Sequence, residues 1–217
     1  MHLSSLKLCL VTHPEHHTFS SYELFIQQAI KGGVTSIQLR NKTQPLGMIR
    51  DTAIALLSLL RPLHIPLMIN DNVALAKEID ADGVHLGQTD LSPLEARQIL
   101  GPDKIIGLSI ETFEQLEQVN QLNCIDYIAA SAIFPSKTKL NCKTIWGLAG
   151  LKTIAQQSKH PVIAIGGMSI SNIRDVMAHG ANGAAVISAI HDHAQPELAA
   201  SELIKEINRG GCHVYTN

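Results

Sequence analysis

The stretch ADGVHLGQTDLSPLEARQIL, residues 81–100, contains one expected strand and one expected helix in close succession. The apolar run 83–86 is typical of a strand that is buried on both faces. From residue 92 onward the apolar side chains recur with a helical period, and Ser92 followed by Pro93 is a typical helix start. Between the two elements lies the polar segment HLGQTD, residues 85–90. The stretch therefore predicts a strand-helix unit with polar side chains just beyond the strand.

The same unit recurs eight times along the chain. The expected strands span 6–12, 34–39, 65–70, 83–86, 104–109, 126–131, 161–166 and 183–188, and the helices that follow them span 20–32, 47–61, 72–79, 92–99, 111–119, 147–157, 170–178 and 197–209. Eight such units without a Pro- or Ser-rich linker predict an α/β protein, a (β/α)₈ TIM barrel in which residues 1–217 form a single domain. A doubly wound open sheet is the alternative, but the first strand lacks the Gly-rich fingerprint of that fold.

Composition narrows the classes of function. The chain has 217 residues, with 17 Lys and Arg against 19 Asp and Glu, so its net charge of -2 gives no basic surface for nucleic acid. It contains no apolar run of about 18 residues, as a membrane span requires, and no signal peptide, so we expect a cytoplasmic protein without a membrane partner. The four cysteines are scattered without a C-x-x-C pair, which favours reduced thiols in packing positions.

Basic side chains follow the second expected strand. In a barrel, active sites lie at the carboxyl ends of the strands, so residues in these positions converge on one face. Arg40 and Lys42 alternate with Asn41 and point to the same side of an extended segment, where Gln38 adds a further donor. Such a row suits a doubly charged, oxygen-rich group such as a diphosphate. Two solvated charges at a strand end are the alternative.

Carboxylates follow the third and fourth expected strands. Asp71 comes directly after Asn70, and Asp90 ends the segment HLGQTD. Two carboxylates after adjacent strands can approach each other, and Mg²⁺ suits such hard oxygen ligands when phosphates are nearby. The alternative is that each Asp caps the helix that follows it, because Asp is a favoured N-cap.

Glycines and hydroxyl groups follow the later strands. Gly166 and Gly167 after the seventh strand, together with Ser188 at the end of the eighth, stand where barrels commonly bind a phosphate through backbone N–H groups. The loop 131–147 is longer than most strand-helix loops and contains the segment PSKTK, residues 135–139. We interpret this loop as a flap over an anion.

These motifs together resemble one family. The segments QLRNK, INDN, ADGVHLGQTD, GLS, IFPSKTK, AIGGM and GANGAAVISAI occur in this order between residues 38 and 190 and are similar to those of the thiamine phosphate synthase family. The resemblance implies a barrel that joins 4-amino-2-methyl-5-hydroxymethylpyrimidine diphosphate to a thiazole phosphate with the help of Mg²⁺. It also implies small-molecule substrates as the partners. A homo-oligomer is compatible with the sequence.

The resemblance also implies roles for single residues. The implied ligands are Gln38, Arg40, Lys42, Asn70, Ser109 and Lys139 for the pyrimidine diphosphate, Asp71 and Asp90 for Mg²⁺, and Ser136, Thr138, Gly167, Ile187 and Ser188 for the thiazole phosphate. Arg40, Lys42, Lys139 and Ser109 form the implied catalytic group, which stabilises the departing diphosphate. For His85 we favour a packed, hydrogen-bonded position at the end of a strand over a direct chemical role.

The chain departs from the family pattern at a few positions. Ser131-Ala132 replaces a usual Gly-Pro, Ser136 replaces a usual Thr, and Glu111 stands where a His is common. That His serves catalysis in the related thiazole tautomerases, so its absence argues against a tautomerase. A barrel that binds thiamine precursors without catalysis is a second alternative, which the intact Asp pair disfavours. The segments HPEHH, residues 13–17, and HDH, residues 191–193, lack the ligand spacing of a zinc site.

Overall fold

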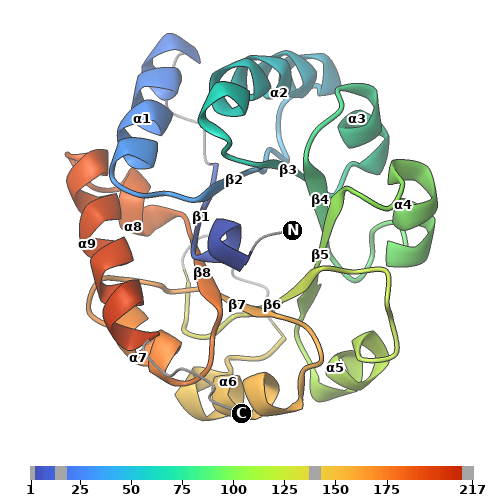
Figure 1. Ribbon diagram of the computed structural model, residues 1–217, viewed down its shortest axis with the longest axis vertical. Coiled ribbons are helices and arrows are strands. Elements are labelled where there is room, and N and C mark those ends of the chain that lie inside the picture. The colour runs from blue at the N-terminus through green and yellow to red at the C-terminus, as the bar shows by residue number, and fades with distance from the viewer. Residues whose placement is uncertain (1–2, 13–18, 137–142, 212–217) are drawn as a thin grey trace.

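The computed structural model describes residues 3–12, 19–136 and 143–211 and shows a closed barrel of parallel strands surrounded by helices (Figure 1). Strands β1 to β8 pair in sequence order, and β8 pairs with β1 to close the ring. The predicted (β/α)₈ barrel is confirmed, and the open doubly wound sheet is excluded because the sheet has no edge strand.

The elements lie close to the expected ranges. The strands are β1 Leu8–Val11, β2 Ser36–Leu39, β3 Leu67–Asn70, β4 Gly83–Leu86, β5 Ile105–Ile110, β6 Tyr127–Ser131, β7 Val162–Ile165 and β8 Gly183–Val186. The helices are α1 Phe19–Lys31, α2 Leu46–Leu60, α3 Val73–Glu78, α4 Pro93–Leu100, α5 Phe113–Val119, α6 Gly147–Gln157, α7 Ile173–Ala178, α8 Ser188–His191 and α9 Pro196–Gly210. Two 3₁₀ helices, η1 Leu3–Leu6 and η3 Arg61–Leu63, complete the described elements.

The expected end of the eighth strand is wrong. We expected the eighth strand to run from residue 183 to Ser188, but β8 ends at Val186 and Ser188 begins the short helix α8. Ile187 lies between them with φ -122° and ψ -83°, which leaves the extended conformation and turns the chain. The hydrophobic pattern could not reveal this turn, because the apolar run continues across it and a helix of four residues has no period.

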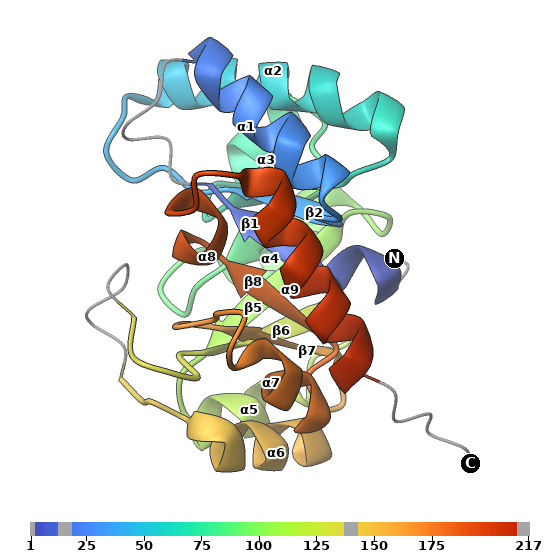
Figure 2. The ribbon, with the colours of Figure 1, turned by 90° about the vertical axis from the view of Figure 1, so that its left-hand side faces the viewer.

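The strands are apolar on both faces because the two faces belong to two cores. Leu8 and Leu10 of β1 pack outward with the helices, whereas Cys9 and Val11 lie in the barrel interior with Tyr127. The interior core also contains Leu6 of η1. The short helix η1 lies over the middle of the strand ring in Figure 1. The amino-terminal end of the barrel is therefore closed by η1. In Figure 2, α8 lies at the opposite end of the barrel from η1.

A repeated hydrogen bond orders the closed end. The side chain of the residue just before β2, β4, β6 and β8 accepts a hydrogen bond from a backbone N–H near the start of the preceding strand. The donors and acceptors are Leu8 N to Thr35 Oγ1 (2.9 Å), Leu67 N to Asp82 Oδ2 (2.8 Å), Ile106 N to Asp126 Oδ2 (2.8 Å) and Val162 N to Asn182 Oδ1 (2.7 Å). These bonds satisfy N–H groups that the strand ladder leaves unpaired. The polar residues before the strands thus serve the fold, and those after the strands are available for function.

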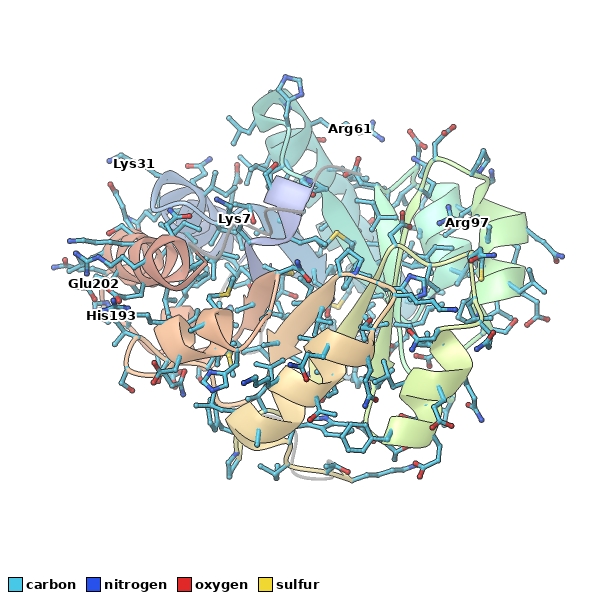
Figure 3. The ribbon with its side chains drawn as sticks, turned by 60° about the horizontal axis from the view of Figure 1, so that its bottom comes forward. Lys7, Lys31, Arg61, Arg97, His193 and Glu202 are labelled. Carbon is cyan, nitrogen blue, oxygen red and sulfur yellow. The ribbon has the colours of Figure 1, made fainter. Side chains whose placement is uncertain are left out.

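Arg97 of α4, labelled in Figure 3, connects this helix to the same closed end of the barrel. Its guanidinium donates to Asp126 Oδ2 at 2.9 Å and to the backbone oxygens of Gly101, Pro102, Lys104 and Cys124. The planar fork of an arginine suits several acceptors at once. Arg97 is therefore a structural anchor for the loop that leads into β5.

The cysteines of the described ranges match the expectation of reduced thiols. Cys9 and Cys124 are both free, and burial raises the pKa of Cys9 to about 11. A thiol with a raised pKa is a packing group and a poor nucleophile. None of the helices in the described ranges is both long enough and apolar enough to span a membrane.

Candidate active site at the carboxyl ends of the strands

A cavity of about 380 Å³ opens at the carboxyl ends of the strands. This volume is in the usual range for a small-molecule site. The predicted site residues that line it are Gln38, Arg40, Lys42, Asn70, Asp71, Asp90, Ser109, Ser136, Gly167, Ile187 and Ser188. Thr138 and Lys139 lie outside the described residues. Every predicted site residue that the structure describes therefore faces one cavity, and the role of each stays a prediction.

Asp71 meets Lys42 across the mouth of the cavity. Lys42 Nζ lies 3.4 Å from Asp71 Oδ2, and the Asp71 side chain is 33% exposed. Asp71 has a positive φ of 66°, a conformation that few residues other than glycine adopt, and its N–H donates to the backbone oxygen of His85 at 2.9 Å. The N-cap of α3 is Asn72, whose side chain accepts from Leu75 N at 2.9 Å. The alternative that Asp71 is a helix cap is therefore wrong.

Asp90 closes the turn that follows β4. Its Oδ2 accepts a hydrogen bond from Gly87 N at 2.7 Å. The cap of α4 is again the next suitable residue, Ser92, which forms a reciprocal capping box with Glu95. Asp90 is thus free of the capping role that we considered for it, and the turn holds its carboxylate at the cavity.

The two aspartates influence each other. Burial raises the pKa of Asp71, and Asp90 raises it further, both as a hydrogen-bonding neighbour and as a negative charge, while Lys42 lowers it. The net direction is upward because one partly solvated ammonium does not offset burial and a second carboxylate. A site that destabilises a carboxylate in this way is suited to a cation.

Arg40 is held in place through its backbone. Its N–H donates to the hydroxyl of Thr12 at 2.9 Å, and the same hydroxyl donates to the Arg40 carbonyl at 3.2 Å. Thr12 is buried just beyond β1. This pair of bonds fixes the chain where it leaves β2, so the guanidinium starts from a rigid base at the cavity wall.

The glycine pair after β7 accommodates the loop that follows β6. Gly166 and Gly167 have φ values of 100° and 65°. A Cβ at Gly166 would lie 2.4 Å from the Cβ of Ala132, and one at Gly167 would lie 2.7 Å from the Cβ of Phe134. Both positions therefore require glycine for backbone conformation and for close packing, and the packing brings Ser136 to the cavity.

A hydrogen bond from the His191 side chain stabilises the turn at Ile187 and Ser188. The His191 Nδ1 lies 2.9 Å from the Ile187 carbonyl oxygen, so it donates to that oxygen, and Nε2 lies 3.0 Å from the hydroxyl of Tyr22. Tyr22 belongs to α1 and His191 to α8. The turn that lines the cavity is therefore tied to a helix outside the barrel.

Sequence reasoning missed Lys143. It lines the cavity with Glu111, and within the described ranges it forms no ion pair. Three residues further on, the buried Trp146 donates from its backbone to Ala132 O at 2.9 Å and from its indole to Ser131 O at 3.2 Å. A lysine shortly before a large apolar anchor at the end of a long loop is the signal that could have identified it.

The described residues contain no cluster of three or more His, Cys, Asp or Glu side chains that could hold a metal alone. The Asp71 and Asp90 carboxylates, the predicted donors, line the cavity together with Glu111. That donor set fits Mg²⁺, which usually takes one or two carboxylates and completes its shell with water and substrate phosphates.

Fold and cavity together define a class of protein. A closed (β/α)₈ barrel with basic, acidic and hydroxyl side chains gathered at the carboxyl ends of its strands is a barrel enzyme.

Comparisons with known proteins identify the family. The model of a family described as thiamine monophosphate synthase matches residues 8–190. The thiamine-phosphate synthase of Chlamydia caviae is 40% identical over 204 residues, which cover 94% of this chain and 96% of that one. The thiamine-phosphate synthase of Leptospira biflexa is 45% identical over 199 residues, which cover 90% and 91%. The chain therefore belongs to the thiamine monophosphate synthase family.

Solved structures agree with this placement. The thiamine phosphate pyrophosphorylase from Pyrococcus furiosus superposes with a TM-score of 0.86 at 32% identity, over 96% of this chain and 98% of that one. The 3-hexulose-6-phosphate synthase from Salmonella typhimurium, at 16% identity and a TM-score of 0.73 over 94% of this chain and 100% of that one, shares the fold alone.

Proposed function

We propose that the protein makes thiamine phosphate and pyrophosphate from 4-amino-2-methyl-5-hydroxymethylpyrimidine diphosphate and 4-methyl-5-(2-phosphooxyethyl)thiazole. The observation that carries the proposal is the shared cavity: the two aspartates, the basic pair that follows β2 and the turn at Ser188 all line it. Two phosphorylated substrates need two anion sites within reach of each other. Membership of the family supports the same reaction.

Residue roles follow the two ends of the cavity. Gln38, Arg40, Lys42, Asn70, Ser109 and Lys139 hold the pyrimidine diphosphate, and Ser136, Thr138, Gly167, Ile187 and Ser188 hold the thiazole phosphate. The positive charges of Arg40 and Lys42 support the first group. The backbone geometry of the glycine pair and the turn supports the second.

Asp71 and Asp90 are the Mg²⁺ ligands in this proposal. When bound, Mg²⁺ neutralises charge on the diphosphate and so makes it a better leaving group. The raised pKa of Asp71 supports the assignment, because a cation relieves the repulsion between the two carboxylates.

The chemistry needs no side-chain nucleophile. The bond between the pyrimidine methylene carbon and the diphosphate oxygen breaks, and its electron pair leaves with the diphosphate. The lone pair of the thiazole nitrogen then forms the new C–N bond at the same carbon. An electron-rich aminopyrimidine stabilises the intervening cation, so the step is dissociative. The residues stabilise the departing charge through Arg40, Lys42, Lys139 and Ser109, and they hold the nitrogen close.

The alternatives fit the cavity less well. A thiazole tautomerase has no diphosphate to bind, so Arg40 and the aspartate pair would have no ligand. In addition, Glu111 replaces the histidine that such an enzyme uses. A non-catalytic binding barrel has no need of a second carboxylate, Asp90, that raises the pKa of Asp71. Beyond the reaction, we propose one domain over residues 1–217, a cytoplasmic location and a homo-oligomer.

The proposal is tested by pyrophosphate release with each substrate alone and with both together. We expect release to require Mg²⁺ and to rise strongly when the thiazole phosphate is added. Equal release without the thiazole phosphate indicates a hydrolase, and no release under any condition contradicts the proposal.

A further inference from the structure

Four buried or partly buried polar side chains form a network in the floor of the cavity, and three of them, Gln38, His85 and Ser109, line it. His85 of β4 lies with Nδ1 2.8 Å from the hydroxyl oxygen of Tyr127 in β6, and with Nε2 2.8 Å from Ser109 Oγ in β5. The side chain of Gln38 in β2 lies beside the same Tyr127 hydroxyl and lowers its pKa as a hydrogen-bonding neighbour. Gln38, His85 and Tyr127 are 4%, 6% and 3% exposed, so water cannot replace these bonds. The expectation of a packed, hydrogen-bonded His85 is confirmed.

Close packing and further hydrogen bonds fix the positions of these hydrogen-bonded side chains. A Cβ at Gly107 would lie 2.1 Å from the Tyr127 ring, so only glycine leaves room for that ring. The His85 and Tyr127 rings stack, with their centroids 5.5 Å apart. Gln88 donates to the Ser109 carbonyl at 2.7 Å and fixes the serine backbone. Which atom donates in each hydrogen bond depends on the tautomer of His85.

Tyr127 sets that tautomer. Burial raises its pKa well above the usual value, so its hydroxyl keeps its single proton. A phenol is a stronger hydrogen-bond donor and a weaker acceptor than an aliphatic hydroxyl, so the favoured arrangement has the Tyr127 hydroxyl donate to His85 Nδ1, 2.8 Å away. A neutral imidazole that accepts at Nδ1 carries its proton on Nε2 and donates it to Ser109 Oγ.

We propose that Tyr127 and His85 are positioning residues that turn the Ser109 hydroxyl into a hydrogen-bond donor aimed into the cavity. Ser109 lines that cavity, and because its oxygen already accepts from His85, its own proton is available to a ligand. The partner is an acceptor atom of the pyrimidine diphosphate, an identification that rests on the proposed function. A ligand that presents a donor at the same point leaves two donors facing each other and binds poorly.

The proton direction is measurable in the free protein. Nitrogen-15 NMR of the histidine rings, with the His85 signals assigned by their loss in His85→Gln, distinguishes the two neutral tautomers. We expect the proton on Nε2. A proton on Nδ1 reverses both hydrogen bonds of His85 and overturns the inference. This result does not depend on activity, so it is decisive even if the protein forms no thiamine phosphate and the proposed function fails.

A double-mutant cycle tests whether Tyr127 acts through Ser109. Tyr127→Phe keeps the ring and removes only the hydroxyl, and we expect kcat/KM for the pyrimidine diphosphate to fall about tenfold with the thiazole phosphate KM unchanged. In a Ser109→Ala background the same change should have almost no further effect. An equal loss in both backgrounds, or a loss shared by both substrates, shows a merely structural role and contradicts the inference.

Discussion

Asp71→Asn should make the protein more stable while it removes activity. In the wild type, burial and Asp90 raise the pKa of Asp71, so the folded state holds this carboxylate less favourably than the unfolded state does. The amide removes that negative charge. Because the side chain is 33% exposed, solvent screens the effect, and we expect a gain in unfolding free energy below about 1 kcal/mol. A gain of that size raises Tm by roughly 2–4 °C at most in a protein of this length.

The sign of the effect depends on pH. An acid whose folded pKa is raised lowers stability above that pKa, and stability recovers as the pH falls through it and the carboxyl group takes up its proton. The Tm difference between Asp71→Asn and the wild type should therefore be positive at pH 7 and shrink on acidification. Asp103→Asn is the matched control, because Asp103 is exposed before β5 at the opposite end of the barrel, and we expect no Tm change there.

Ligand binding reverses the order of stability. With Mg²⁺ and inorganic pyrophosphate at about 100 times the dissociation constant, the wild type should gain about 2.7 kcal/mol, or roughly 5–10 °C in Tm. Asp71→Asn should gain little, and its kcat should fall by about 10²–10³-fold. The assay is thermal unfolding with and without the ligands, followed by steady-state kinetics. A full ligand-induced shift in the variant refutes the metal assignment.

Three further outcomes are expected. Lys143→Ala should raise the thiazole phosphate KM several-fold. The control Lys152→Ala, at an exposed position of α6, should have the wild-type KM. Equal kinetics in the two variants contradict a role for Lys143 in the site. Ser188→Ala should also raise mainly the thiazole phosphate KM, and a matching loss for the diphosphate substrate would sink that assignment. Arg97→Ala removes five hydrogen bonds at the closed end and should lower the unfolding free energy by about 3 kcal/mol, measured by urea denaturation, with KM for both substrates unchanged.

The barrel could be predicted because its signal is local and repeated. Each strand is a short apolar run, each long helix has its own period, and eight repetitions leave few other folds. The convergence of Arg40, Asp71 and Asp90 followed from the fold alone, since residues after parallel strands share one face. Helix α8 was missed because four residues are too few for a period to be visible.

Contacts between distant residues were beyond the reach of the sequence. Nothing near His85 in the chain indicates that it bonds Tyr127, which is 42 residues away and reaches it only after the barrel closes. The helix-cap alternative for the aspartates failed for a local reason instead, because Asn72 and Ser92 occupy the caps. The place of Lys143 depends on how the loop returns to Trp146, and that packing has no periodic signal.

The most direct test is mass spectrometry of the product from the two purified substrates, run with Mg²⁺ and with a chelator. The account predicts thiamine phosphate and an equal amount of pyrophosphate with Mg²⁺, neither product with the chelator, and product formation that is about 10²–10³-fold slower with Asp71→Asn. An unchanged mixture of substrates in the presence of Mg²⁺, or a rearranged thiazole phosphate without C–N bond formation, would contradict it.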